Sequence, residues 1–197
     1  MGFLDALLGR SKPKRPDLDR LFDVPSAATT LEVNGWTPTG VGSVCFRAAE
    51  GAAFSETQAD AQSLIQANDG PRVEQTRDEF GFTWLTVRAE PDEPDATSSV
   101  VTGLHAVNSS LESAGFGSLL LCSIIGLTQT SPSGGTQKLA LVYLYKRGTF
   151  YPFAPRAGTA QQRDNAIELN VRGLIAGDLP VEPELSRWFA VWGAPGL

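Results

Sequence analysis

The side chains best suited to chemistry in this sequence are one histidine and two cysteines. His105 is the only imidazole, and Cys45 and Cys122 are the only thiols. A single histidine excludes sites that need two imidazoles, and the thiols lack the ligand count and spacing of a structural zinc site. The apolar segments around both cysteines predict reduced thiols in the core, with a disulfide as the alternative. A cysteine nucleophile served by His105 is a further alternative, because the sequence does not place these side chains relative to one another.

Other catalytic spacings do not occur in the sequence. No serine has glycine two residues away on both sides, which a nucleophile elbow requires. Gly40 and Gly42 begin a dinucleotide-type loop, but a cysteine stands in place of the third glycine, and no glycine run leads to Gly-Lys-Ser/Thr. Acidic pairs at 78–79 and 92–95 have the groups for acid–base chemistry, but their turn-rich surroundings favour solvated charge. We therefore expect no catalytic residues, no metal and no cofactor.

Composition narrows the class of protein. The chain has 197 residues, 42% of them hydrophobic, which is enough for one sizeable core and favours a single domain. The 16 basic and 22 acidic residues give a net charge of −6, which repels phosphate backbones and argues against nucleic acid as a partner. The longest apolar run falls well short of the roughly 20 residues that a spanning helix needs. The first residues place apolar before basic side chains, the reverse of a secretory signal, so we expect a cytoplasmic location.

Residues 1–20 are predicted to form an N-terminal arm, and 21–197 the single domain. In the arm, apolar residues that share one side of a helix precede a basic stretch, an arrangement suited to weak contact with an anionic membrane surface. Each basic residue contributes about 1 kcal/mol near such a surface, so we expect peripheral and reversible contact. The alternative is an arm that docks on its own domain or is disordered. The expected membrane or partner contacts are Phe3, Leu4, Leu7, Leu8, Lys12, Lys14 and Arg15.

A second candidate contact surface lies in the aromatic segment 143–153. Two adjacent cations interrupt it, and aromatic residues with arginine are common anchors of protein interfaces. The predicted partner surface consists of Tyr145, Lys146, Arg147 and Tyr151. The alternative is a core strand that ends in a basic turn.

The elements that would position these residues indicate an α+β fold with an antiparallel sheet flanked by helices. The spacing of Val100, Leu104, Val107 and Leu111 predicts a helix over 98–114 that ends at Gly115, with a boundary histidine at position 105 bonding a neighbour. Two other helices are expected, at 55–68 and from residue 159 through 175. Strands are expected as a hairpin within 29–47 and at 73–78, 82–89, 118–129 and 137–147, with an edge strand at 150–153. Residues 185–197 are expected to pack back as a lid.

Several long segments resemble the bacterial family of PspA-associated proteins called PspAB. These segments are 1–10 (MGFLDALLGR), 40–54 (GVGSVCFRAAEGAAF), 104–112 (LHAVNSSLE), 141–155 (LVYLYKRGTFYPFAP) and 185–197 (LSRWFAVWGAPGL). The resemblance implies a link to the phage-shock response, whose central PspA remodels membranes, and to a membrane protease of the HtpX type. The order of elements is also similar to the type III secretion chaperone fold and its YbjN-like relatives, a likeness of fold alone.

These observations lead to a hypothesis of a non-enzymatic adaptor in a membrane-stress system. Its partner would be PspA or an HtpX-type protease, and the arm would bring it to the membrane. The alternative is a small-ligand binder or an enzyme with a pocket near His105, Lys146 and Arg147. A third hypothesis is a homo-oligomeric scaffold.

Overall fold

A six-stranded antiparallel sheet organises the described part of the chain. The computed structural model describes residues 16–47, 59, 72–130, 134–158 and 161–197. The strands are β1 (Thr37–Arg47), β2 (Arg72–Arg77), β3 (Phe82–Arg88), β4 (Leu120–Thr130), β5 (Thr136–Leu144) and β6 (Thr149–Phe153), in the order β2-β3-β1-β4-β5-β6. The predicted α+β class with a single antiparallel sheet is confirmed, and β6 lies at an edge as expected.

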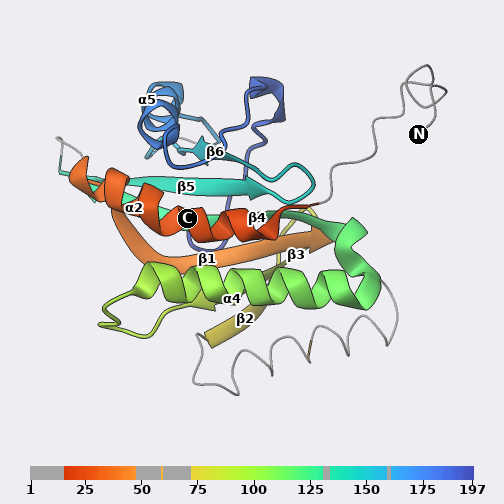
Figure 1. Ribbon diagram of the computed structural model, residues 1–197. Helices are drawn as coiled ribbons and strands as arrows, with labels where there is room; N and C mark the ends of the chain where they lie inside the picture. The colour runs from red at the N-terminus through yellow and green to blue at the C-terminus, as the bar shows by residue number, and fades with distance from the viewer. Residues whose placement is uncertain (1–15, 48–58, 60–71, 131–133, 159–160) are drawn as a thin grey trace, which may run out of the picture.

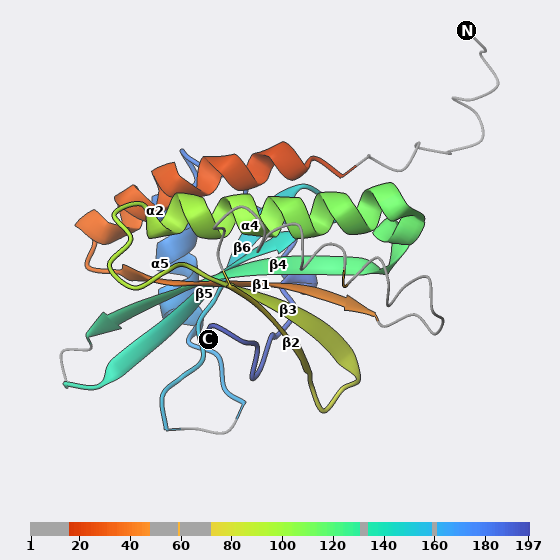
Figure 2. The same ribbon diagram turned by 90° about the horizontal axis from the view of Figure 1, so that it is seen from below.

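Helices cover one face of the sheet. Helices α2 (Val24–Val33) and α4 (Ala96–Leu111) lie side by side across it, and α5 (Asn165–Ile175) packs beside β6 (Figures 1 and 2). Shorter helical turns are η1 (Leu18–Asp23), η2 (Glu112–Phe116), η3 (Gly117–Leu119) and η4 (Leu185–Arg187). Leu18 and Leu21 of η1 are buried in the core, so the boundary predicted after residue 20 falls inside an element that packs against α4.

Helix α4 follows the predicted pattern. Val100, Leu104, Val107 and Leu111 are buried on its inner side. Asp95 caps its start by accepting a hydrogen bond from Ser98 N at 3.4 Å, and Gly115 beyond its end has a φ of 89°. The repeated spacing of large apolar residues over four turns made this helix predictable.

The hairpin predicted within 29–47 is wrong in its first half. Residues 24–33 form α2, and the strand β1 begins only at Thr37. Leu31 and Val33, in the stretch that begins at Thr29, suggested a strand, but Ala27 and Leu31 are buried at a helical spacing, and a proline sits in the first turn, where it is tolerated. Burial against the sheet thus overrides the local preference of β-branched residues for a strand. Gly35, with a φ of 86°, follows the end of the helix and does not form a hairpin turn.

Of the two other predicted helices, one begins later than expected, and the other falls outside the described residues. The helix expected from residue 159 begins at Asn165, because Asp164 supplies the cap by accepting from Ile167 N at 3.1 Å. Val171 and Ile175 are buried on its inner side as predicted. The helix expected at 55–68 lies outside the described residues.

The second face of the sheet is covered by the C-terminal strap, which we define as residues 188–197. Trp188 stacks on Tyr151 with ring centroids 5.7 Å apart, and Trp192 meets the Phe153 ring edge-on at 4.8 Å. Ser43 Oγ on β1 donates a hydrogen bond to Pro195 O at 3.0 Å. The expectation that the end of the chain packs back over the domain is confirmed, and the sheet therefore separates two apolar layers.

Candidate functional site

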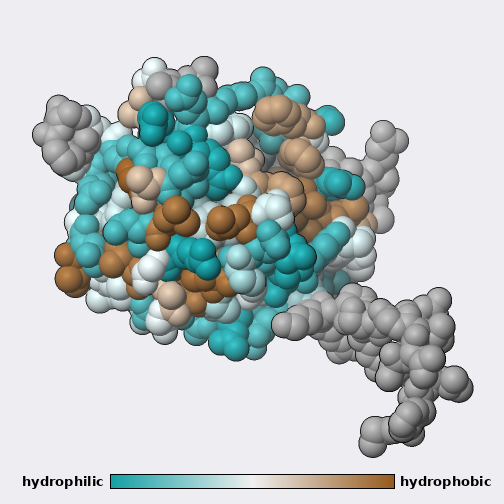
Figure 3. Space-filling model, turned by 90° about the horizontal axis from the view of Figure 1, so that it is seen from above, coloured by the Kyte–Doolittle hydropathy of each residue, from teal (hydrophilic) through white to brown (hydrophobic). Residues whose placement is uncertain are grey.

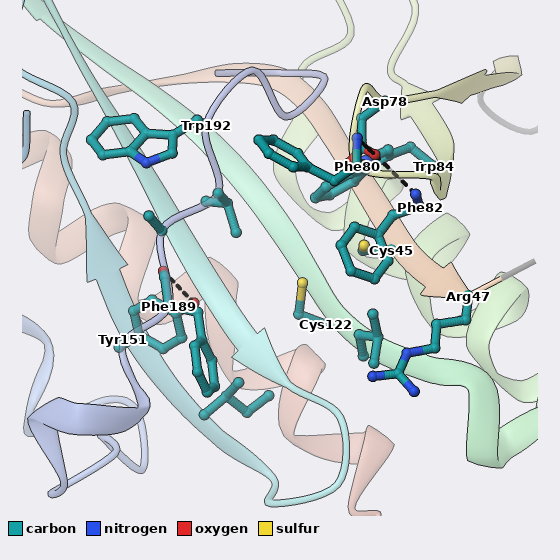
Figure 4. Close-up of a pocket in the computed structure, with 14 residues that line it drawn as sticks. Cys45, Arg47, Asp78, Phe80, Phe82, Trp84, Cys122, Tyr151, Phe189 and Trp192 are labelled. Atoms are coloured by element: carbon teal, nitrogen blue, oxygen red, sulfur yellow. Dashed lines mark hydrogen bonds between the residues drawn. The ribbon is translucent and has the colours of Figure 1, made fainter. Parts of the chain in front are cut away.

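A hollow remains where the strap leaves the second face of the sheet uncovered. Its volume is about 430 Å³, and it lies between the turn of the β2–β3 hairpin and the strap. Figure 4 shows Phe80, Phe82 and Trp84 on one side of it, Tyr151, Phe189 and Trp192 on the other, and Cys122 between them. The hollow is therefore assembled from segments far apart in the sequence.

The hairpin wall is held by Asp78. Its Oδ1 accepts hydrogen bonds from Phe80 N at 3.0 Å and Phe82 N at 2.9 Å, and its Oδ2 accepts from Trp84 Nε1 at 2.9 Å. These bonds tie both carboxylate oxygens to the turn and fix the ring of Trp84 against the floor. Asp78 thus serves as a structural acceptor, which accounts for the acidic pair at 78–79 without acid–base chemistry.

The floor contains the only two cysteines of the chain. Cys45 on β1 and Cys122 on β4 are direct partners in the register of the two strands, and both are free and buried. A hydrogen bond with the Cys122 thiol, together with burial, raises the pKa of Cys45 well above its usual range. Both thiols are free, as predicted, and the raised pKa makes Cys45 a poor nucleophile.

The strap wall is fixed through Tyr151. Its hydroxyl donates to Phe189 O at 2.9 Å, which holds the strap backbone at the edge of the hollow. The Phe189 side chain itself is 62% exposed, and Phe80 on the opposite rim is 58% exposed. Two large aromatic side chains therefore stand in solvent on either side of one apolar depression.

One cation stands at the mouth of the hollow. Arg47 is the last residue of β1 and is exposed. It forms no hydrogen bond or ion pair with the rest of the described chain. Within the described part of the chain nothing pairs with its guanidinium, which can therefore meet an anionic group from outside.

His105 lies on the other side of the sheet from the thiols. Its Nε2 is 3.5 Å from Asp19 Oδ1, its ring centroid is 4.8 Å from that of Phe22, and Nδ1 is 3.4 Å from Ser109 Oγ. The prediction of a boundary histidine bonding its neighbours is confirmed. The cysteine–histidine alternative is wrong, because α4 carries His105 over one face while both thiols belong to the apolar layer on the opposite face.

The predicted partner surface is only partly at the surface. Tyr145 and Tyr151 are 2% and 1% exposed, because each belongs to one of the two apolar layers. Lys146 is exposed, and Arg147 is half-exposed. The pocket expected near His105, Lys146 and Arg147 is not the hollow described above, to which none of the three contributes.

Arg147 forms an ion pair with the buried carboxylate of Glu182. Its Nε donates to Glu182 Oε2 at 2.6 Å, Thr149 Oγ1 donates to the same oxygen at 2.8 Å, and Arg187 donates to Oε1 at 3.2 Å. Burial alone would raise the pKa of Glu182, but the hydrogen bonds from Arg147 and Thr149 outweigh it and lower the pKa to about 2. This network ties the chain that leads into the strap to the β5–β6 turn.

Most residues that build the hollow could not be recognised from the sequence. Phe80 carried the one local signal, since a large aromatic residue inside the short turn Asp78-Glu79-Phe80-Gly81 has no core to enter. Arg47, Phe189 and the thiols come together only through strand register and the path of the strap.

In the part of the chain that the structure describes, no helix is long and apolar enough to cross a membrane. The described residues also contain no cluster of three or more histidine, cysteine or acidic side chains that would hold a metal ion. On the face shown in Figure 3, hydrophobic residues form separate patches among hydrophilic ones.

The comparison with known families decides what kind of protein this is. The family model described as PspA associated protein B matches residues 1–196. The chain belongs to the PspAB family. The resemblance seen in the sequence is thereby confirmed, and membership in PspAB is consistent with an accessory role in a PspA system. No curated protein and no solved structure matches the chain, so the likeness to type III secretion chaperones stays a prediction.

Proposed function

We propose that this PspAB protein is a non-enzymatic adaptor that binds PspA at the inner surface of the membrane. The observation that carries the proposal is the match of the PspAB family to residues 1–196. An HtpX-type protease is the second partner that the proposal allows. The absence of a recognised catalytic spacing in the sequence favours binding over catalysis.

The arm joins the domain next to the β5–β6 turn, which supports a shared role of the arm and Lys146 in contact with a partner or a membrane. Tyr143 Oη donates a hydrogen bond to Asp17 O at 2.8 Å, and a Cβ at Gly148 would lie 3.4 Å from Asp17 Cβ. The chain therefore enters the domain beside the β5–β6 turn that carries Lys146. The basic residues of the arm are thus attached at the end of the molecule where Lys146 is exposed.

This arrangement suggests one basic end of an otherwise acidic protein. Lys12, Lys14 and Arg15 would act with Lys146 on an anionic surface, and Arg147 would add less because it is paired with Glu182. With a net charge of −6, the chain as a whole is repelled by anionic lipid. Contact would therefore depend on orientation and would weaken as salt screens the charges.

Binding to purified PspA from the same genome tests the adaptor role. We expect saturable binding by the full-length chain in a surface-based or calorimetric assay. A Lys146→Glu variant should bind more weakly, whereas Arg172→Glu, an equal charge change on α5, should bind like the wild type. A full-length protein that shows no saturable binding to PspA or to the HtpX-type protease contradicts the proposal.

Deletion of residues 1–15 tests the membrane contact. We expect the truncated protein to lose flotation with anionic liposomes, because the three basic residues at 12, 14 and 15 contribute about 1 kcal/mol each, together a factor of about 150 in partitioning. Its melting temperature should remain within about 2 °C of the wild type, since Leu18 is the first core residue among those that the structure describes and is kept in the truncated protein. A large loss of stability would assign the arm to the fold, and unchanged flotation would remove it from the membrane contact.

A further inference from the structure

Almost all polar side-chain groups that line the hollow form hydrogen bonds within the protein. Both oxygens of Asp78 accept hydrogen bonds from the hairpin, the indole N–H of Trp84 donates to Asp78, and the hydroxyl of Tyr151 donates to the strap. A ligand in the hollow would therefore meet aromatic and aliphatic surface, not free hydrogen-bonding groups. An apolar body suits this interior.

Arg47 is the exception at the mouth. It is exposed, lines the hollow and has no partner in the described chain, whereas the other charged lining residue, Asp78, is tied into its turn. A single free guanidinium beside an apolar depression favours an anionic group on the ligand, since arginine binds carboxylates with paired N–H donors.

The size and floor of the hollow favour a small ligand over a bulky one. The volume of about 430 Å³ is within the range of roughly 300–1,000 Å³ found for small-molecule sites. Its floor is made by Cys45 and Cys122, and buried free cysteines pack as small apolar groups.

We propose that the hollow binds a single-chain amphiphile with a carboxylate head, of the fatty-acid class. Its hydrocarbon chain would lie against Phe82, Trp84 and Cys122, between the exposed rings of Phe80 and Phe189 (Figure 4). Its carboxylate would pair with Arg47 at the mouth. This inference rests on Arg47 and the apolar lining of the hollow, not on Lys146 or the arm, and does not depend on the proposed interaction with PspA.

Calorimetric titration with dodecanoate, below its micelle concentration, tests the proposal. We expect saturable binding to the wild type and binding at least about tenfold weaker for dodecyltrimethylammonium, which has the same chain and the opposite charge. Arg47→Glu should weaken dodecanoate binding by roughly tenfold to a hundredfold. Arg77→Glu is the matched control, because Arg77 is exposed on β2, which β3 separates from β1, and does not line the hollow. Its affinity should stay within about twofold of the wild type.

The two cysteines provide a second readout of where the ligand lies. Because they are the only thiols in the chain and both line the hollow, the rate of modification by a small neutral thiol reagent reports on that place alone. Saturating dodecanoate should slow this reaction in the wild type and in Arg77→Glu. Absence of saturable binding, equal affinity for the cationic amphiphile, unchanged affinity in Arg47→Glu, or unprotected thiols would each overturn the proposal.

Discussion

Replacing Gly126 by alanine is expected to displace the C-terminal strap from the sheet. Gly126 lies on β4 where the strap crosses it, and a Cβ at this position would overlap Gly196 O and come within 2.8 Å of Thr39 Oγ1. The overlap is with main chain, so no side-chain rotation relieves it. Overpacking of this kind costs about 1–3 kcal/mol, and a displaced strap would also expose Trp188 and Val191, which are 5% and 9% exposed in the native fold.

Thermal unfolding measures this effect. For a domain of this size each kcal/mol lowers the melting temperature by about 2–4 °C, so Gly126→Ala should melt roughly 5–10 °C below the wild type. The matched control is Gly173→Ala in α5, where nothing lies within 4 Å of an added Cβ. That change should stabilise the protein by about 0.5–1 kcal/mol, because alanine is the better helix former. Equal melting temperatures for the two variants would show that the strap does not need this close approach.

Faster modification of the two cysteines is the expected structural sign of strap displacement. Tyr151 holds Phe189 O, and the strap forms one wall of the hollow above Cys122. A strap that leaves the sheet opens the thiols to reagent in Gly126→Ala but not in Gly173→Ala. A destabilised variant with wild-type thiol reactivity would place the damage elsewhere.

The sequence predicted those elements whose burial is repeated along one segment. Helix α4 has four apolar residues at helical spacing, and β5 alternates side chains into two apolar layers, so both could be recognised locally. Helix α2 was missed, because only Val24 and Leu31 on its inner side are large, and Ala27 and Ala28 between them give a weak apolar pattern. Leu31 and Val33 then favoured a strand.

The hollow could not be predicted because no segment contains it. Cys45 and Cys122 become neighbours only through the pairing of β1 with β4, and Phe189 reaches the same place only because the strap crosses the sheet. The sequence also gave no means of separating His105 from the thiols, which the sheet does. The aromatic segment 143–153 was recognisable as unusual, yet its tyrosines are buried, since alternation places them in the two apolar layers.

Replacing Glu182 by alanine is expected to loosen the chain that leads into the strap. The Glu182 side chain is fully buried and accepts hydrogen bonds from Arg147, Thr149 and Arg187, while its main chain is paired with Phe150. Removal of one partner of a buried ion pair costs about 3–5 kcal/mol, and because both arginines are half-exposed and can be rehydrated we expect about 2–3 kcal/mol. Glu182→Gln, which keeps the shape and the acceptor oxygen, should lose less, and Glu32→Gln on the exposed side of α2 should lose almost nothing.

The pH dependence of unfolding distinguishes the charge of Glu182 from its shape. Its pKa is lowered from 4.5 to about 2 in the folded protein, so its ionised form stabilises the fold fully above its unfolded pKa. This contribution is lost as the pH falls through the folded pKa. The difference in unfolding free energy between wild type and Glu182→Gln, measured with denaturant, should be constant above about pH 5 and shrink towards pH 2. A difference that does not change with pH would mean that Glu182 acts through packing and neutral hydrogen bonds, with no contribution from its charge.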